Sequence, residues 1–170
     1  MRYKSKGFLA LFTGALLIVS VPNSSRAQSK SMATEELARR ADVIVVGKVT
    51  AVQSEWNADR SRIYTTVTVA IDQNIKGQGN PISVTISTPG GEIGGVGEWY
   101  SHTPKFKVDE EVVVFAEREK GGRLIVSGGD QGKLTVMNEE STGSKTVIDS
   151  EPLMMYTSRL KSVVQAQSRE

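Results

Sequence analysis

Residues 82–87 read Ile-Ser-Val-Thr-Ile-Ser, and this alternation of apolar and hydroxyl side chains decides the fold class. Successive side chains of a β-strand point to opposite faces of a sheet, so a period of two indicates one buried and one exposed face. The apolar side chains should therefore face a core, and the hydroxyl side chains should not. The three expected core residues are Ile82, Val84 and Ile86.

Strand patterns continue on both sides of this segment. Residues 63–71 alternate in the same way, and residues 43–52 and 111–119 are rich in β-branched side chains, as strands are. Shorter strands are expected at 124–126 and 133–137. Five or six antiparallel strands joined by short turns predict a mainly β fold: a small five- to six-stranded Greek-key, OB-like barrel. An edge-open sandwich is the alternative.

A helix is expected at each end of the strand region. Residues 31–41 place Thr34 as an N-cap, acidic residues in the first turn and basic residues in the last. Residues 151–167 carry an apolar stripe at helical spacing behind Ser150 as N-cap, and this stripe should face the core. Its members are Leu153, Tyr156, Leu160, Val163 and Val164. The polar residues 138–149 predict a mobile loop or a weak hairpin.

The first 27 residues have the pattern of a cleaved secretory signal. Basic residues precede a 14-residue apolar run at 8–21, and Ser25 and Ala27 are the small residues expected before a cleavage site. The run is shorter than the roughly 20 residues of a membrane-spanning helix. We therefore expect an exported protein, periplasmic or secreted, with no membrane span after cleavage. It would begin at Gln28 and form one domain over 28–170.

Composition excludes several kinds of site. The chain has no cysteine and one histidine, which rules out disulfides, thiol catalysis and Cys-type zinc sites, and no metal site or cofactor is expected. The first 27 residues carry four basic and no acidic side chains, so the remainder has 17 basic against 19 acidic residues. A net charge of −2 and seven remaining aromatic residues disfavour a single-stranded nucleic-acid-binding OB module.

Two glycine-rich loops are the only candidate site. Residues 89–97 hold five glycines in nine positions and lead into Trp99, Tyr100 and His102. A second such loop, 127–132, contains Asp130 and Gln131. Neither has the signature of a phosphate-binding loop. Either the glycines make the sharp bends that close a barrel, or the long irregular stretch 88–109 is a binding loop.

We take the loop residues as candidate ligand contacts. They are Glu92, Trp99, Tyr100, His102, Asp130 and Gln131, with the loop glycines Gly90, Gly91, Gly94, Gly95, Gly97, Gly128, Gly129 and Gly132. A carboxylate pair such as Glu92 and Asp130, on neighbouring loops, is the arrangement that a hydrolase with two carboxylates would use. No set of nucleophile, base and orienting group can be assembled from the chain, so catalysis is the alternative and not the main expectation.

Two resemblances add to this interpretation. The helix leading into Ala41-Asp42-Val43, the strand that contains Tyr64, and the turn Ile75-Lys76-Gly77 resemble the opening of netrin-like modules, which include the N-terminal domains of tissue inhibitors of metalloproteinases. The resemblance covers about residues 35–89 and implies an OB-fold barrel. Those inhibitors chelate the protease zinc through an N-terminal cysteine, which this chain lacks. A metalloprotease partner is therefore conceivable by resemblance only.

The chain also resembles a group of uncharacterised exported bacterial proteins. They share a stretch similar to 89–97, a pattern P-x-F-x-x-G-E-x-V-V-V-F that fits residues 104–115, and a pattern G-x-x-Q-G-K that fits 128–133. Asp109 stands where the second pattern has glycine, and Asp tolerates positive φ better than most residues. Taken together, we expect a non-catalytic exported binding module whose partner is an exported protein or a glycan.

Overall fold

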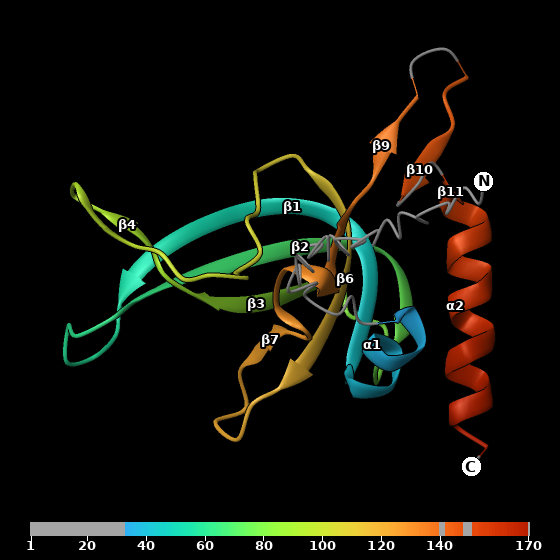
Figure 1. Ribbon diagram of the computed structural model, residues 1–170, viewed down its shortest axis with the longest axis horizontal. Coiled ribbons are helices and arrows are strands. Elements are labelled where there is room, and N and C mark those ends of the chain that lie inside the picture. The colour runs from blue at the N-terminus through green and yellow to red at the C-terminus, as the bar shows by residue number, and fades with distance from the viewer. Residues whose placement is uncertain (1–32, 140–141, 148–150, 170) are drawn as a thin grey trace, which may run out of the picture.

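The computed structural model describes residues 33–139, 142–147 and 151–169, and its main element is one antiparallel sheet (Figure 1). Along the path β3-β2-β1-β6-β7 each strand pairs with the next, and β8 pairs with β6 on the same edge as β7, nearer the start of β6. The sheet comprises β1 (Val43–Trp56), β2 (Ile63–Lys76), β3 (Ser83–Pro89), β6 (Glu111–Arg118), β7 (Leu124–Val126) and β8 (Lys133–Thr135). The expectation of a mainly β fold is confirmed.

Strand β6 and the first part of β1, residues 44–47, are buried on both faces, which explains their nearly continuous apolar sequences. Ile44 and Val113 point to a core cluster shared with the helices, whereas Val45 and Val112 point to a second cluster inside the curl of the sheet. Inward-facing residues of β2 and β3 complete the second cluster: Val67, Val69, Val84 and Ile86. A period of two therefore separates two cores across one sheet.

The sheet is not a closed barrel. Strands β3 and β7 are its two ends, and within the described part of the chain no hydrogen-bonded pairing joins them. Their apolar side chains nevertheless share the second cluster, inside the curl of the sheet and called the inner cluster below, with Val84 on β3 and Val126 on β7. The expected Greek-key barrel is thus replaced by a strongly curled open sheet that side-chain packing holds together.

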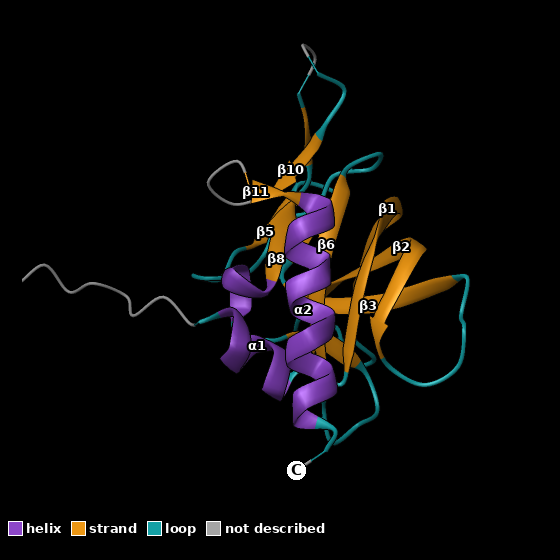
Figure 2. Ribbon diagram, turned by 90° about the vertical axis from the view of Figure 1, so that its right-hand side faces the viewer, coloured by secondary structure: helices purple, strands orange, loops and turns teal. Residues whose placement is uncertain are grey.

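Both helices cover the same side of the sheet (Figure 2). Helix α1 (Thr34–Arg40) has its acidic and basic ends as expected, but Ala33 occupies the N-cap position and Thr34 is already helical. Helix α2 (Leu153–Gln167) buries Leu153, Tyr156 and Leu160, and the two valines of the expected stripe pack against the same cluster. Ser150, expected as the N-cap of this helix, lies outside the described residues.

Two further expectations need correction. Ile82 precedes β3 and is 87% exposed, so it is not a core residue. The segment expected as one strand over 133–137 is split into β8 and β9 (Met137–Asn138). Strand β9 pairs with β10 (Lys145–Val147), which pairs with β11 (Glu151–Pro152) ahead of α2. The predicted weak hairpin therefore lies between β9 and β10.

Candidate functional site

A short hairpin lies inside the stretch that was expected to be irregular. Strand β4 (Gly91–Ile93) pairs with β5 (Val96–Glu98), with Ile93 opposite Val96. The two residues between them, Gly94 and Gly95, have φ values of 57° and 82°. Positive φ at both central positions is what a type I′ turn requires, and glycine adopts it without steric cost. The Gly-Gly pair therefore has a structural role.

The hairpin is folded back onto the ends of β1 and β2. Gly90 donates its N–H to the Ile63 carbonyl at 2.8 Å, and its own carbonyl accepts a hydrogen bond from Thr65 Oγ1 at 2.7 Å. A Cβ at Gly91 would collide with the hydroxyls of Ser54 and Thr65. The glycines before β4 thus let the chain approach the sheet closely, which fixes the position of the hairpin and of the residues that follow it.

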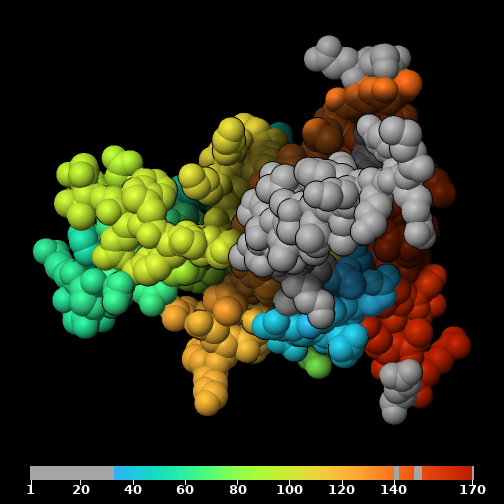
Figure 3. Space-filling view, viewed as in Figure 1, coloured from blue at the N-terminus to red at the C-terminus, as the bar shows by residue number. Residues whose placement is uncertain are grey.

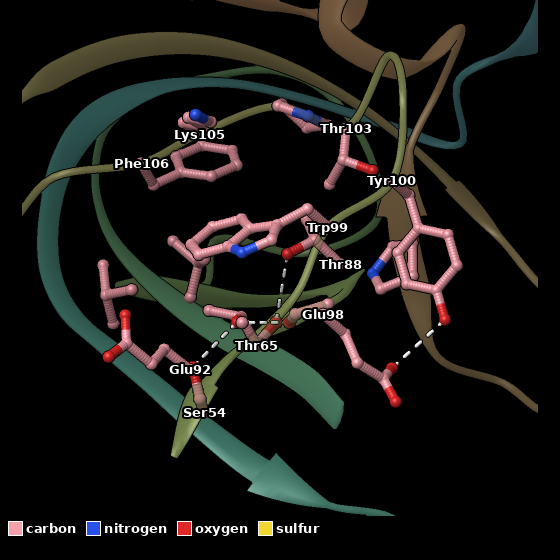
Figure 4. Close-up of a pocket in the computed structure, with 16 residues that line it drawn as sticks. Ser54, Thr65, Thr88, Glu92, Glu98, Trp99, Tyr100, Thr103, Lys105 and Phe106 are labelled. Atoms are coloured by element: carbon pink, nitrogen blue, oxygen red, sulfur yellow. Dashed lines mark hydrogen bonds between the residues drawn. The ribbon is translucent and has the colours of Figure 1, made fainter. Parts of the chain in front are cut away.

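A groove of about 380 Å³ opens between this hairpin, the sheet and the segment 103–106 (Figure 4). Its floor is formed by β1 and β2 with Val52, Ser54, Thr65 and Val67. Of the predicted contacts, Glu92, Trp99 and Tyr100 line it, as do Gly90 and Gly91. The hairpin lies at the far end of the molecule from α2, which leaves this end free of helices (Figures 1 and 3).

The hydroxyl groups near the floor bond mainly to the protein itself. Thr65 Oγ1 donates to the Gly90 carbonyl, so Ser54 Oγ is the donor in its 3.0 Å hydrogen bond to Thr65 Oγ1. Thr88 Oγ1 donates to the Thr65 carbonyl at 3.4 Å. Each hydroxyl proton is therefore already used, and the floor offers a ligand mostly methyl groups and lone pairs.

Trp99 is the most exposed aromatic residue of the groove, with 69% of its surface accessible. The ammonium of Lys105 lies 5.5 Å from the centre of its ring, within the range of a cation–π interaction. Since a Trp side chain usually buries its apolar area, so much exposed ring beside a groove is typical of a contact surface.

Tyr100 is held by a chain of hydrogen bonds. Arg62 Nη1 donates to its hydroxyl at 2.6 Å, and this hydroxyl donates to Glu98 Oε2 at 3.1 Å. The same carboxylate oxygen accepts the Ile63 N–H at 3.1 Å. The hydrogen bond with Tyr100, together with the charge of Glu98, raises the pKa of Arg62. The carboxylate of Glu98 therefore holds the Tyr100 side chain in place.

The opposite wall is anchored by an ion pair. Lys133 on β8 bonds to Glu110 Oε1, and the two side chains are only 11% and 14% exposed. Lys133 also lies 5.4 Å from the centre of the Phe106 ring, and Glu110 accepts the Lys107 N–H at 3.1 Å. Burial alone would raise the pKa of Glu110, but hydrogen bonds from Lys133 and Thr135 outweigh it and leave this pKa below its ordinary value.

The turn before Glu110 keeps the shape that glycine would give it. Asp109 has a φ of 69°, its N–H donates to the Val49 carbonyl at 2.9 Å, and its carboxylate pairs with Lys48 at 2.7 Å. The expectation that aspartate preserves this turn is confirmed.

The predicted contacts His102, Asp130 and Gln131 lie outside the groove. His102 has an exposed side chain whose Nδ1 is 3.6 Å from Asp130 Oδ2, and its carbonyl accepts the Asp130 N–H at 2.8 Å. The second loop contains the short 3₁₀ helix η1 (Gly129–Gly132), and Gly129 packs against the His102 carbonyl. Gln131 belongs to η1 and is not among the groove residues. Asp130 therefore does not join Glu92 as a carboxylate pair.

Several groove residues were missed by the sequence analysis. Ser54 and Thr65 look like ordinary strand residues, and their place at the groove depends on a hairpin that folds over them. Phe106 and Lys133 each belong to a pattern noted in the sequence, but their contact joins residues 27 positions apart and could not be derived from spacing. The pattern identified the segments without indicating that they touch.

The sequence matches no protein-family model, and the search of curated proteins finds no similar one. Within residues 33–139, 142–147 and 151–169, no helix is long and apolar enough to cross a membrane. The same residues contain no group of three or more His, Asp or Glu side chains arranged to hold a metal ion.

Proposed function

We propose that this chain is a non-catalytic binding module whose contact surface is the groove between the β4–β5 hairpin and residues 103–106. The observation that carries the proposal is Trp99, which is 69% exposed and directly follows a hairpin that is hydrogen-bonded to β2. A groove lined by aromatic rings and a few polar groups is the usual form of a ligand site. The partner would be an exported protein or a glycan.

The charged groups of the groove support binding over hydrolysis. A glycosidase needs a proton donor and a second carboxylate a few ångströms apart. Glu98 accepts two hydrogen bonds, and Asp130 pairs with His102 outside the groove. Glu92 would remain as a single carboxylate without a partner for acid–base catalysis.

Export belongs to the same proposal. The basic residues, the apolar run at 8–21 and Ala27 support cleavage of a signal peptide, although these residues lie outside the described part of the structure. Intact-mass measurement of the exported protein should give a chain that starts at Gln28. Finding Met1 on the mature protein would contradict export by this signal.

An OB-like origin of the fold also remains a proposal. The ends β3 and β7 share one apolar cluster without pairing, as the edges of a barrel opened between them would. This arrangement supports the resemblance to netrin-like modules at the level of architecture alone, because fold does not imply function.

Binding is tested with Trp99→Ala on two arrays, one of peptides and one of soluble oligosaccharides. Because Trp99 is exposed, we expect the free energy of unfolding to change by less than about 0.5 kcal/mol. The midpoint of thermal unfolding should therefore stay near that of the wild type. Binding to the array that the wild type recognises should weaken at least tenfold, since aromatic anchors often dominate interface energies.

The matched control is Val108→Ala, which trims another exposed apolar side chain that does not line the groove. It should change neither stability nor binding. Wild-type protein that binds nothing on either array, or binds equally well without the Trp99 ring, would contradict the proposed function.

A further inference from the structure

We propose that the groove takes an extended peptide segment with a basic side chain, bound partly through the main chain of residues 103–106. This inference rests on the proposed function and names the ligand class of the same site. Three features of the groove carry it: a wall whose main-chain groups pair with no other main chain, an unpaired carboxylate in the same groove as an exposed aromatic ring, and a floor whose hydroxyl protons are already used.

The wall formed by residues 103–106 belongs to no helix and no strand. Across the described part of the chain, the N–H groups of Thr103, Lys105 and Phe106 donate to no main-chain carbonyl, and the carbonyls of this segment accept from no main-chain N–H. All four residues line the groove. A segment whose main-chain donors and acceptors pair with no other strand can accept an added strand, which is a common way of binding peptides.

This wall does not depend on a ligand for its position. Pro104 is buried, and Phe106 lies against Lys133, whose ion pair with Glu110 ties the segment to β6 and β8. The main-chain groups are thus presented in a fixed arrangement, which lowers the entropy lost when a peptide pairs with them.

The carboxylate of Glu92 favours a basic side chain near it, in a groove that the Lys105 ammonium also lines. In the region that the structure describes, the carboxylate of Glu92 has neither a hydrogen bond nor an ion pair, and it lines the same groove as Trp99 (Figure 4). The ring of Trp99 already attracts one cation, the Lys105 ammonium. A Lys or Arg side chain of a ligand would meet both a free carboxylate and an aromatic face.

A glycan fits the groove less well. Sugar hydroxyls would find no open hydroxyl donor among Ser54, Thr65 and Thr88, whose protons are bound to protein oxygens. Apolar surface dominates elsewhere, with Val52, Pro89 and Phe106 among the lining residues. Apolar side chains of a peptide would cover this surface, while its main chain would use the free groups of the wall.

The probes are an array of hexapeptides in which one residue is fixed at each position in turn, and an array that carries chitotetraose, maltotetraose and cellotetraose. We expect hexapeptides with Lys or Arg near a large apolar residue to bind, and this binding to fall at least tenfold in Trp99→Ala. Glu92→Gln should reduce the preference for Lys and Arg severalfold and leave the apolar preference unchanged. Glu36→Gln removes the same charge from the exposed face of α1 and should change neither preference.

Main-chain pairing has its own readout. In a strand, only every second residue directs its N–H towards a given neighbour. N-methylation of the best hexapeptide should therefore weaken binding at least tenfold at one set of alternate positions and little at the other set. Equal tolerance at all positions would overturn main-chain pairing.

The outcomes separate this inference from the proposed function. Trp99-dependent binding of the oligosaccharides alone would overturn the peptide assignment and leave the binding module intact. Equal loss of the basic preference in Glu92→Gln and Glu36→Gln would overturn the role of Glu92. Failure of every probe on both arrays would overturn the proposed function itself.

Discussion

Val84 and Thr85 are neighbours in β3 that face opposite sides of the sheet. Val84 belongs to the inner apolar cluster, and Thr85 is exposed. Val84→Asp would place an unpaired carboxylate in this cluster, so we expect loss of cooperative unfolding. Thr85→Asp should lower the unfolding free energy by less than about 1 kcal/mol. Chemical denaturation followed by circular dichroism measures both.

Ile82 provides the control for this pair because it is apolar but exposed. Ile82→Asp should be as mild as Thr85→Asp. If Ile82→Asp and Val84→Asp prove equally damaging, the core of the protein extends beyond the start of β3, contrary to the structure.

Ile82 also shows what an alternating pattern cannot reveal. A period of two tells which residues share a face of a strand, and on that basis Ile82, Val84 and Ile86 are equivalent. Whether anything covers that face depends on neighbouring elements. Val84 and Ile86 are covered by the cluster that includes Val126 of β7, whereas Ile82 lies before the strand and has no such cover.

Among the elements, the wall 103–106 depends on the ion pair between Glu110 and Lys133. Glu110→Gln would leave the mostly buried ammonium without its counter-charge. We expect a loss of about 1–3 kcal/mol in the free energy of unfolding at neutral pH. Glu119→Gln is the matched control, because its pair with Arg123 is more exposed and should contribute no more than about 1 kcal/mol.

The sign of the pH dependence follows from the lowered pKa of Glu110. A carboxyl group with a lower pKa in the folded state stabilises the fold above its unfolded pKa of about 4.3. This contribution is lost as the pH falls through the folded value. The stability difference between wild type and Glu110→Gln should therefore shrink below about pH 4. A difference that stays constant down to pH 3 would contradict this account.

The sequence predicted some elements of the candidate site and missed others, and both outcomes have physical reasons. The first glycine-rich loop was recognised because glycine permits turns that other residues resist, and Trp99 and Tyr100 follow it directly. The hairpin itself was missed because strands of three residues are too short to show a periodicity. His102 and Asp130 were grouped with the groove, although the second loop packs behind Tyr100.

At the scale of the whole molecule, the sheet separates two apolar clusters that share the same strands. The outer cluster is the one that the sheet shares with the helices, and it contains Leu160 of α2. The inner cluster lies inside the curl of the sheet and contains Ile86 of β3. Along β1 and β6, successive residues belong to one cluster and then to the other. Loss of packing in one cluster would therefore disturb the strands that also carry the other cluster. The sequence predicted these strands and helices, but the open sheet depends on contacts between distant segments.

This sharing predicts that the described elements unfold in one step. Leu160→Ala and Ile86→Ala each remove a fully buried aliphatic side chain and should cost about 2–5 kcal/mol. Met155→Ala on the exposed face of α2 should stay within about 0.5 kcal/mol. Tryptophan fluorescence reports on Trp56, the last residue of β1, and on Trp99, which follows β5. The end of β1 and the β4–β5 hairpin lie at the other end of the molecule from α2 (Figure 1), and far-UV circular dichroism reports on all strands and helices. Because β1 connects the two ends, Leu160→Ala should lower the unfolding midpoint seen by both probes equally. Two separated midpoints in this variant would mean that the helical layer and the groove end unfold independently, and that the two clusters do not stabilise each other through β1 and β6.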